Sequence, residues 1–252
     1  MLGISPFVSI RAALLLPVIL SACASFETSE VKLGSIRTVG IISAVGDEFS
    51  FTTAGLAGFD RGDRRYSVES WGLDDMIIRQ ASTALSGRFQ VQPLSYSRAA
   101  FAASETDSPV TLVKLIHEDR IEALLRKEPP ASSIDAYIVI VKAESSIGSG
   151  NRKVTGLGAV KYASAFGSYN QLYALYEIRV IDGHSLKLIE KRSAAPFEQA
   201  ELGRLAGRKV DDTYMPSSGD PARNEKLRAA VVDMIERSLA LTLRNLRIAD
   251  EH

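Results

Sequence analysis

The chain contains one cysteine, Cys23, which closes a short apolar run near the amino terminus. Arg11 and the amine of the first methionine precede the apolar stretch from Ala12 to Leu20, which is about as long as the core of a secretory signal. This stretch is too short to span a bilayer, which requires about 20 apolar residues. A lone thiol directly after such a stretch indicates the attachment of a lipid.

Small residues precede this cysteine, and Leu20-Ser21-Ala22-Cys23 resembles the lipobox of bacterial lipoproteins. The resemblance implies that a signal peptide, residues 1–22, is cut immediately before Cys23, and that acyl chains such as palmitate then anchor the mature chain. Each buried methylene of those chains adds about 0.8 kcal/mol of membrane affinity. An ordinary secretory signal and an uncut, buried amino-terminal strand are the alternatives.

The residues after the cysteine bear on location. Ala24 stands where enteric bacteria place an inner-membrane retention aspartate, so the resemblance favours the outer membrane, with the protein facing the periplasm. From Cys23 to Lys32 the chain is polar and short of core residues, as expected for a lipidated tether. We expect one periplasmic α/β domain over residues 33–252.

The charge balance argues against nucleic acid as a partner. Residues 1–22 contain Arg11 and no acidic residue, so 29 of the 30 basic and all 30 acidic side chains remain in the mature chain. A basic surface for nucleic acid is therefore not expected. The hydrophobic fraction of 46% provides for a substantial core. Once Cys23 carries lipid, no thiol remains for a disulfide, a zinc site or cysteine catalysis.

A second set of reactive side chains lies between Gly46 and Arg65. Its four carboxylates are Asp47, Glu48, Asp60 and Asp63. They could gather around a hard cation such as calcium, but their spacing lacks the alternation of known calcium loops, and solvated surface is the simpler interpretation. The segment Gly46-Asp47-Glu48-Phe49 comes within one residue of the GGDEF signature of diguanylate cyclases, but the supporting cyclase context is absent.

Histidine is too scarce to indicate a catalytic or metal centre. The three histidines are His117, His184 and His252. His117 lies four residues from both Val113 and Ile121 on an apolar helical face, which favours a place in or beside the core. We assign no catalytic residue, no metal site and no cofactor from the sequence.

The first elements of the domain form a βαβ pattern. Residues 36–45 are β-branched and nearly continuous in apolar character, which predicts a central strand covered on both faces. Residues 73–85 repeat apolar side chains every four positions, with Asp74 and Asp75 in the first turn and Gly87 as the expected C-terminal cap. Residues 89–94 alternate like a strand, and Pro93 indicates its end or a sheet edge.

The intervening segment, residues 46–65, begins at Gly46 and carries three further glycines, which predicts a long loop that is functional or mobile. It would follow the carboxyl end of the first strand, where open α/β sheets bind ligands.

The second half of the chain continues the alternation. Further expected elements are a helix from Asp107 or Ser108 to Arg126, strands at 134–141, 172–181 and 186–191, and a terminal helix from Asp220 to Leu246. Asp182-Gly183 predicts the turn of a hairpin between the last two strands. Residues 145–168 hold five glycines, which indicates a flexible or hairpin-like insertion.

This order of elements resembles the curli-secretion (CsgG-like) lipoprotein family and its relatives with an anticodon-binding-like α/β domain. The resemblance rests on the lipobox, on residues 36–93, on the strand 134–140 and on the glycine-rich segment leading to Tyr173–Asp182. It implies a lipid-anchored, non-enzymatic protein of export channels or envelope assemblies, with a mixed β-sheet packed by helices. A channel subunit needs membrane hairpins, but Arg152, Lys153 and Lys161 interrupt the apolar pattern of residues 145–168, which favours a periplasmic hairpin.

Two classes of function remain open. The first is a non-enzymatic envelope protein that binds a protein partner or assembles with itself. The second is a periplasmic hydrolase or ligand-binding domain that uses the acidic loop 46–65. Aromatic side chains are favoured at interfaces or in the core, and the candidates are Phe49, Phe51, Phe59, Tyr173 and Tyr176.

Overall fold

The computed structural model describes residues 33–54, 63–103, 120–127, 134–147, 152–164, 167–194, 205, 207–215 and 220–249. They form a mixed α/β fold with two five-stranded sheets and one separate two-stranded hairpin, which confirms the predicted fold class. The sequence predicted one sheet, whereas the strands divide between two.

The first sheet has the strand order β11-β10-β5-β1-β4. Its strands are β1 (Thr38–Ala44), β4 (Gln90–Gln92), β5 (Ala136–Lys142), β10 (Tyr176–Asp182) and β11 (Leu188–Ser193). β1 runs parallel to both β4 and β5, and β10 runs antiparallel to β5 and β11. The predicted interior strand, the edge strand next to Pro93 and the hairpin after Asp182 are all confirmed.

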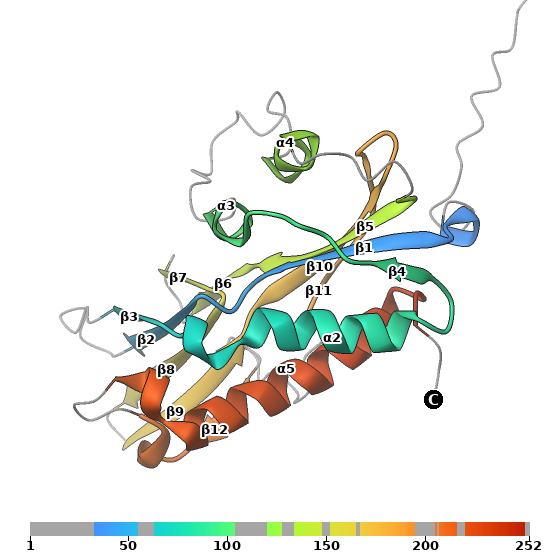
Figure 1. The fold of residues 1–252 in the computed structure, drawn as a ribbon. Coiled ribbons are helices and arrows are strands. Elements are labelled where there is room, and N and C mark those ends of the chain that lie inside the picture. The colour runs from blue at the N-terminus through green and yellow to red at the C-terminus, as the bar shows by residue number, and fades with distance from the viewer. Residues whose placement is uncertain are drawn as a thin grey trace, which may run out of the picture.

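Helices cover both faces of this sheet (Figure 1). On one face lie α2 (Leu73–Leu85) and α5 (Glu225–Asn245), and on the other lie α3 (Arg98–Ala103) and α4 (Arg120–Lys127). Alternate residues of β1 point to the two faces: Ile41 joins the core beneath α2 and α5, and Ile42 joins the core with α3 and α4. This two-sided burial explains the unbroken apolar sequence of β1.

The predicted helix α2 buries Leu73, Ile77, Ala81 and Leu85 and completes the βαβ unit β1-α2-β4. The expected cap at Gly87 is wrong, because Ser86 ends the helix in a right-handed conformation and Gly87 is not among the positive-φ glycines. Most of the helix predicted up to Arg126 lies outside the described residues, and its last part corresponds to α4.

The second sheet has the strand order β12-β9-β8-β2-β3. Its strands are β2 (Glu48–Ala54), β3 (Arg64–Ser67), β8 (Leu157–Ser164), β9 (Gly167–Ala174) and β12 (Arg208–Val210). The prediction of a loop over residues 46–65 is therefore wrong for its described part. Phe49 and Phe51 alternate with more exposed neighbours along β2 and bury their rings, which stabilises a strand in place of a loop.

The predicted strand over residues 172–181 is in fact two strands in different sheets. The chain leaves β9 and enters β10 at Leu175, whose N–H donates to Gly156 O at 2.8 Å and whose carbonyl accepts from Ala143 N at 3.0 Å. Neither glycine nor proline marks the break. Alternation continues across it because each strand buries one face in the same large core.

The glycine-rich segment forms hairpins, as expected, but it is not only an insertion. β6 (Glu144–Ile147) and β7 (Arg152–Thr155) form the separate two-stranded hairpin. β8 and β9 form a second hairpin, in which β8 also pairs parallel with β2. Because Leu157 and Ala159 of β8 are buried in the main core, this hairpin is part of the packed domain.

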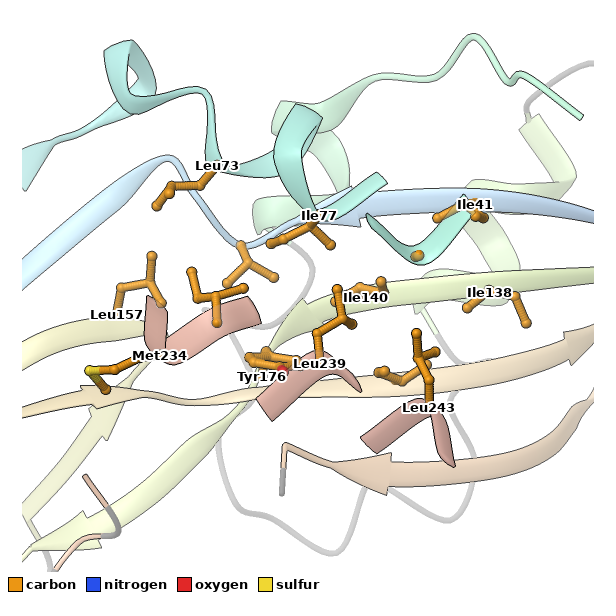
Figure 2. Packing of buried hydrophobic residues seen from close by; sticks show 14 of the residues in the cluster. Ile41, Leu73, Ile77, Ile138, Ile140, Leu157, Tyr176, Met234, Leu239 and Leu243 are labelled. Atoms are coloured by element: carbon orange, nitrogen blue, oxygen red, sulfur yellow. The ribbon is translucent and has the colours of Figure 1, made fainter. Parts of the chain in front are cut away.

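The predicted terminal helix is α5, and it packs beside α2 (Figure 2). Met234, Leu239 and Leu243 of α5 face the side chains of Leu73 and Ile77 and the strands beneath them. The side chain of Asn224 caps the helix by accepting from Leu227 N at 3.0 Å. A short 3-10 turn, Pro221–Arg223, occupies the predicted start.

Candidate functional site

The carboxyl ends of β1 and β4 mark the point where the chain switches faces of the first sheet. From β1 the chain proceeds, by way of the second sheet, to α2 on one face, and from β4 it proceeds to α3 on the other. Open α/β sheets bind ligands outside the carboxyl ends of their parallel strands. The polar side chains gathered here therefore form the first candidate for a ligand-binding or catalytic site.

Asp74, in the first turn of α2, is the centre of this group. Its side chain is only 3% exposed. Oδ1 accepts hydrogen bonds from Ser43 Oγ at 2.6 Å and Val45 N at 2.8 Å, and Oδ2 accepts from Gly46 N at 3.2 Å. The carboxylate thus collects three donors from the end of β1 and the residues after it. Its position near the helix amino terminus also favours the negative charge.

Tyr96 and Arg98 complete the group from the segment that follows β4. The Tyr96 hydroxyl accepts from Ser43 N and donates to Ser43 O, both at 2.9 Å. Arg98 Nη2 lies 2.7 Å from Asp75 Oδ1, and its Nε lies 3.8 Å from Asp74 Oδ2. Burial lowers the pKa of the Arg98 guanidinium, but its bonds to Asp75 and Tyr96 and the charge of Asp74 outweigh burial and raise it.

This arrangement joins elements: Asp75 and Arg98 pair with each other at the surface, whereas Ser43 and Asp74 are buried beneath them. Ser43 is fully buried, so its hydroxyl cannot reach a substrate, and its proton is already donated to Asp74. Tyr96 packs its ring edge-on against Phe101 and bonds to both backbone groups of Ser43. The group, which we call the switch-point cluster (Ser43, Asp74, Asp75, Tyr96 and Arg98), fixes the end of β1 between α2 and the segment after β4.

The sequence did not single out this cluster. It placed Asp74 and Asp75 at the start of a helix but gave no partner for either, and it did not select Ser43, Tyr96 or Arg98. The sequence offered one signal for this cluster: Asp74 stands in the first turn of a helix that follows a buried strand and its loop.

The carboxylates of the predicted acidic loop lie apart in the structure. Asp47, in the turn before β2, forms an ion pair with Lys142 Nζ at 2.6 Å. Glu48 lies 3.8 Å from Arg65 on the surface. Asp63 lies towards the other end of β2, where it accepts from Thr52 Oγ1 at 2.9 Å and pairs with Arg152 at 2.5 Å.

Each described carboxylate of that loop therefore already faces a cation, while Asp60 lies outside the described residues. Within the described ranges, no group of three or more His, Cys, Asp and Glu side chains is arranged to hold a metal ion. His184, in the β10–β11 turn, is exposed and lies 4.0 Å from Asp135, and His117 and His252 lie outside the described residues.

The candidate contact aromatics are core residues where the structure describes them. Phe49, Phe51, Tyr173 and Tyr176 are all buried, and burial raises the pKa of both tyrosines. The Tyr176 hydroxyl meets Ser238 Oγ at 2.6 Å and so ties β10 to α5. Phe59 lies outside the described residues.

The predicted lipid attachment site also lies outside the described residues, together with Leu20, Ser21, Ala22 and the tether. None of the helices that the structure describes has the length and apolar character needed to cross a membrane. The first described residue, Leu33, is buried in the main core, so the tether joins the fold there.

Comparison with known proteins gives weak structural similarity alone. No protein-family model matches the chain, and no curated protein matches it. Protein XCC0632 from Xanthomonas campestris, of family DUF330, has 9% identity and a TM-score of 0.34, with 84% of this chain and 81% of that chain covered. The lipoprotein GNA1162 from Neisseria meningitidis has 13% identity and a TM-score of 0.26, with 80% and 99% covered.

A homolog of the neuraminyllactose-binding hemagglutinin from Helicobacter pylori has 7% identity and a TM-score of 0.34, with 86% and 87% covered. TM-scores this low establish neither a shared family nor a shared function. The curli-secretion family is not represented among these three structures, and that resemblance remains a prediction.

Proposed function

We propose that the chain is a lipid-anchored protein of the bacterial cell envelope, held in the outer membrane through acylated Cys23 and facing the periplasm. Its α/β domain acts without catalysis, by binding a protein partner or further copies of itself in an envelope or export assembly. The observation that carries the proposal is the order of apolar stretch, Leu20-Ser21-Ala22 and lone Cys23, followed by a polar tether.

The arrangement of polar side chains favours binding over catalysis. At the carboxyl end of β1, the Tyr96 hydroxyl is bonded to the backbone of Ser43, and the buried Ser43 hydroxyl is bonded to Asp74. The alternative, a hydrolase or ligand-binding domain built on the acidic loop, draws less support because Asp47 is paired with Lys142 and Asp63 with Arg152.

Membrane fractionation of the native protein beside Cys23→Ser tests the anchor, with the intact mass of the mature form measured on the same preparation. We expect the native chain in the membrane fraction, beginning at Cys23 and carrying the mass of acyl chains, and the variant without that mass. Ser25→Ala, two residues further on, is the matched control and should behave like the native protein. A native chain with an unmodified Cys23 would overturn the proposal.

Crosslinking in cells tests the assembly. We expect the native protein to appear in larger crosslinked species that Cys23→Ser forms less readily. A native protein that stays monomeric and captures no envelope protein contradicts the assembly role, even where the anchor is present.

A further inference from the structure

Four segments meet at the end of the domain where the tether joins it (Figure 1). Arg37 O accepts from Gln90 N at 2.8 Å, which brings in the start of β4. Asp135 Oδ2 accepts from the N–H groups of Arg37 and Thr38 at 2.8 Å each, and Asp135 O accepts from Gly183 N at 2.7 Å. These bonds hold the start of β1, the start of β5 and the β10–β11 turn together.

Exposed cations surround this end. Arg37 Nη1 donates to the carbonyls of Gly34 at 3.0 Å and Ile36 at 3.1 Å, and Arg88 Nη1 donates to the carbonyl of Arg247. Carbonyls orient a guanidinium without neutralising it. Among the described residues, neither of these arginines nor Lys187 of the β10–β11 turn forms an ion pair.

Two carboxylates also lie at this end and keep their charge, but backbone donors hold both of them in place. Asp135 accepts the N–H groups named above, and Asp182 accepts from His184 N at 3.1 Å and Ser185 N at 2.7 Å. Leu188 follows Lys187 in the chain. Among the described residues, it is the large hydrophobic side chain that is exposed to solvent, with an exposed fraction of 49%. An exposed apolar side chain on a surface that also carries cations is suited to a membrane interface, where the apolar group enters the headgroup layer and the cations meet lipid phosphates.

We propose that this proximal end (Arg37, Arg88, Lys187 and Leu188) rests on a phospholipid surface, with Leu188 entering the headgroup layer and the three cations contacting lipid phosphates. This rests on the proposed function, because the anchor on Cys23 brings the end to the lipid. Cys23 precedes Leu33 by ten residues. Such a tether spans at most about 35 Å, so this end stays close to the membrane.

The opposite end would then point away from the membrane. The 21-residue helix α5 runs between the two ends, and at about 1.5 Å per residue it is roughly 30 Å long. β8, β9 and β2 lie beyond its start (Figure 1). An upright domain therefore presents the second sheet to partners in the periplasm.

Site-directed labelling tests this orientation on the full lipid-bearing protein. Acylated Cys23 is a thioether, so in Leu188→Cys the introduced cysteine is the one free thiol. We attach a fluorophore there, reconstitute the protein in vesicles of phosphatidylcholine and phosphatidylglycerol, and measure quenching by lipid-borne bromine. Ala163→Cys, exposed near the end of β8, provides the matched label at the far end.

We expect strong quenching at position 188 and little at position 163. The triple variant Arg37→Gln/Arg88→Gln/Lys187→Gln should weaken the contact by roughly fivefold per charge, corresponding to about 1 kcal/mol for each cation near the lipid. The control Arg64→Gln/Lys161→Gln/Arg223→Gln removes the same charge from exposed positions elsewhere and should leave the quenching unchanged.

Equal quenching at the two labels, or equal effects of the two triple variants, overturns the orientation. An intact mass without acyl chains is a separate result, which refutes the anchor instead. In that case, flotation of the Cys23→Ser chain with the same vesicles tests the surface alone. Both triple variants are made in that chain. Less flotation of the Arg37/Arg88/Lys187 variant than of its control supports the lipid contact, and equal flotation overturns it.

Discussion

At the scale of single residues, one buried carboxylate organises the end of the central strand. Asp74 accepts from Ser43 Oγ, Val45 N and Gly46 N, and all three donors lie where water has little access. A buried donor without an acceptor costs about 1–3 kcal/mol. Losing the Asp74 carboxylate should therefore lower the free energy of unfolding more than losing any one of its three donors.

We predict that Asp74→Ala lowers the free energy of unfolding by about 3–5 kcal/mol, because it leaves all three donors unsatisfied. Ser43→Ala removes one donor and should cost only about 1–2 kcal/mol. Urea denaturation followed by circular dichroism measures both. Asp75→Ala, whose pair with Arg98 is exposed, is the neighbouring control and should change stability by less than about 1 kcal/mol. Similar losses for the two aspartates would contradict the argument.

The sequence could not have revealed this cluster, for a reason that is visible in its spacing. Ser43 lies 31 residues from Asp74 and 53 residues from Tyr96. Helical and strand periodicity report which face of one element is buried, but not which polar side chain of another element meets it. Of the cluster, only the two helix-start aspartates were noted, and for their effect on the helix dipole.

At the scale of elements, the β10–β11 turn is stabilised by an ionised side chain. Burial alone raises the pKa of Asp182, but its bonds to the N–H and hydroxyl of Ser185 and to the N–H of His184 outweigh burial and hold the pKa below its ordinary value of 3.8. A depressed folded-state pKa stabilises the protein above the unfolded-state value. That contribution is lost as the pH falls through the folded-state pKa.

We predict that Asp182→Ala destabilises the protein by about 1 kcal/mol at neutral pH, and that the difference from the native protein shrinks below about pH 4. Urea denaturation at pH 7, 5, 4 and 3 measures the trend. Ser193→Ala, an exposed residue of β11, should show no such dependence. A difference that stays constant down to pH 3 would show that the carboxylate charge does not matter.

The end of α5 carries strain that a glycine would relieve. Arg247 adopts φ of 56° while its N–H donates to Arg244 O at 2.7 Å, which is the left-handed position that commonly closes a helix. We predict that Arg247→Gly raises the free energy of unfolding by about 0.5–1 kcal/mol, the steric relief exceeding the added entropy of the unfolded chain. Thermal unfolding measures it.

Leu186 provides the comparison, because it has φ of 57° but also packs against the core of α3 and α4. In Leu186→Gly the lost packing should cancel the relief. A gain there as large as the gain at Arg247 would mean that the packing contributes nothing.

The elements that were predicted correctly share a strong local signal, and those that were missed do not. β1 is a continuous apolar run, α5 is long and periodic, and the β10–β11 hairpin has a turn dipeptide. β2 was mistaken for loop because glycines nearby outweighed the short alternation around Phe49 and Phe51. The break at Leu175 could not be seen, because a bend between sheets there needs no special residue and leaves the alternation intact.

At the scale of the whole molecule, one ion pair ties the two sheets together. Lys142 is the last residue of β5 in the first sheet, and Asp47 stands in the turn that leads into β2 of the second. The chain passes from β5 to the separate hairpin at Ala143 and from β9 to β10 at Leu175; Ala143 N donates to Leu175 O, and Gly156 bonds to both residues. These polar contacts add to the hydrophobic core that the two sheets share.

Because Lys142 is more deeply buried than Asp47, removing one partner of this ion pair should lower the free energy of unfolding by a different amount than removing the other. The side chain of Lys142 is 9% exposed and that of Asp47 is 31% exposed, although Asp47 Oδ1, the atom that faces Lys142, is itself buried. An ion left buried without its partner is costly, whereas a carboxylate with access to water is not. We predict that Asp47→Asn lowers the free energy of unfolding by about 2–4 kcal/mol, and Lys142→Met by only about 1 kcal/mol.

The double variant Asp47→Asn/Lys142→Met should then be nearly as stable as Lys142→Met alone, since no buried ammonium remains, and urea denaturation of all four proteins closes the cycle. Glu48→Gln is the adjacent control, because its contact with Arg65 is exposed and is worth less than about 1 kcal/mol. Equal losses for the two single variants would mean that the ammonium is hydrated, and the ion pair would then not hold the sheets. If the predicted order holds, any loss of activity or binding in Asp47→Ala has to be corrected for unfolding before it counts as support for a site in the acidic segment.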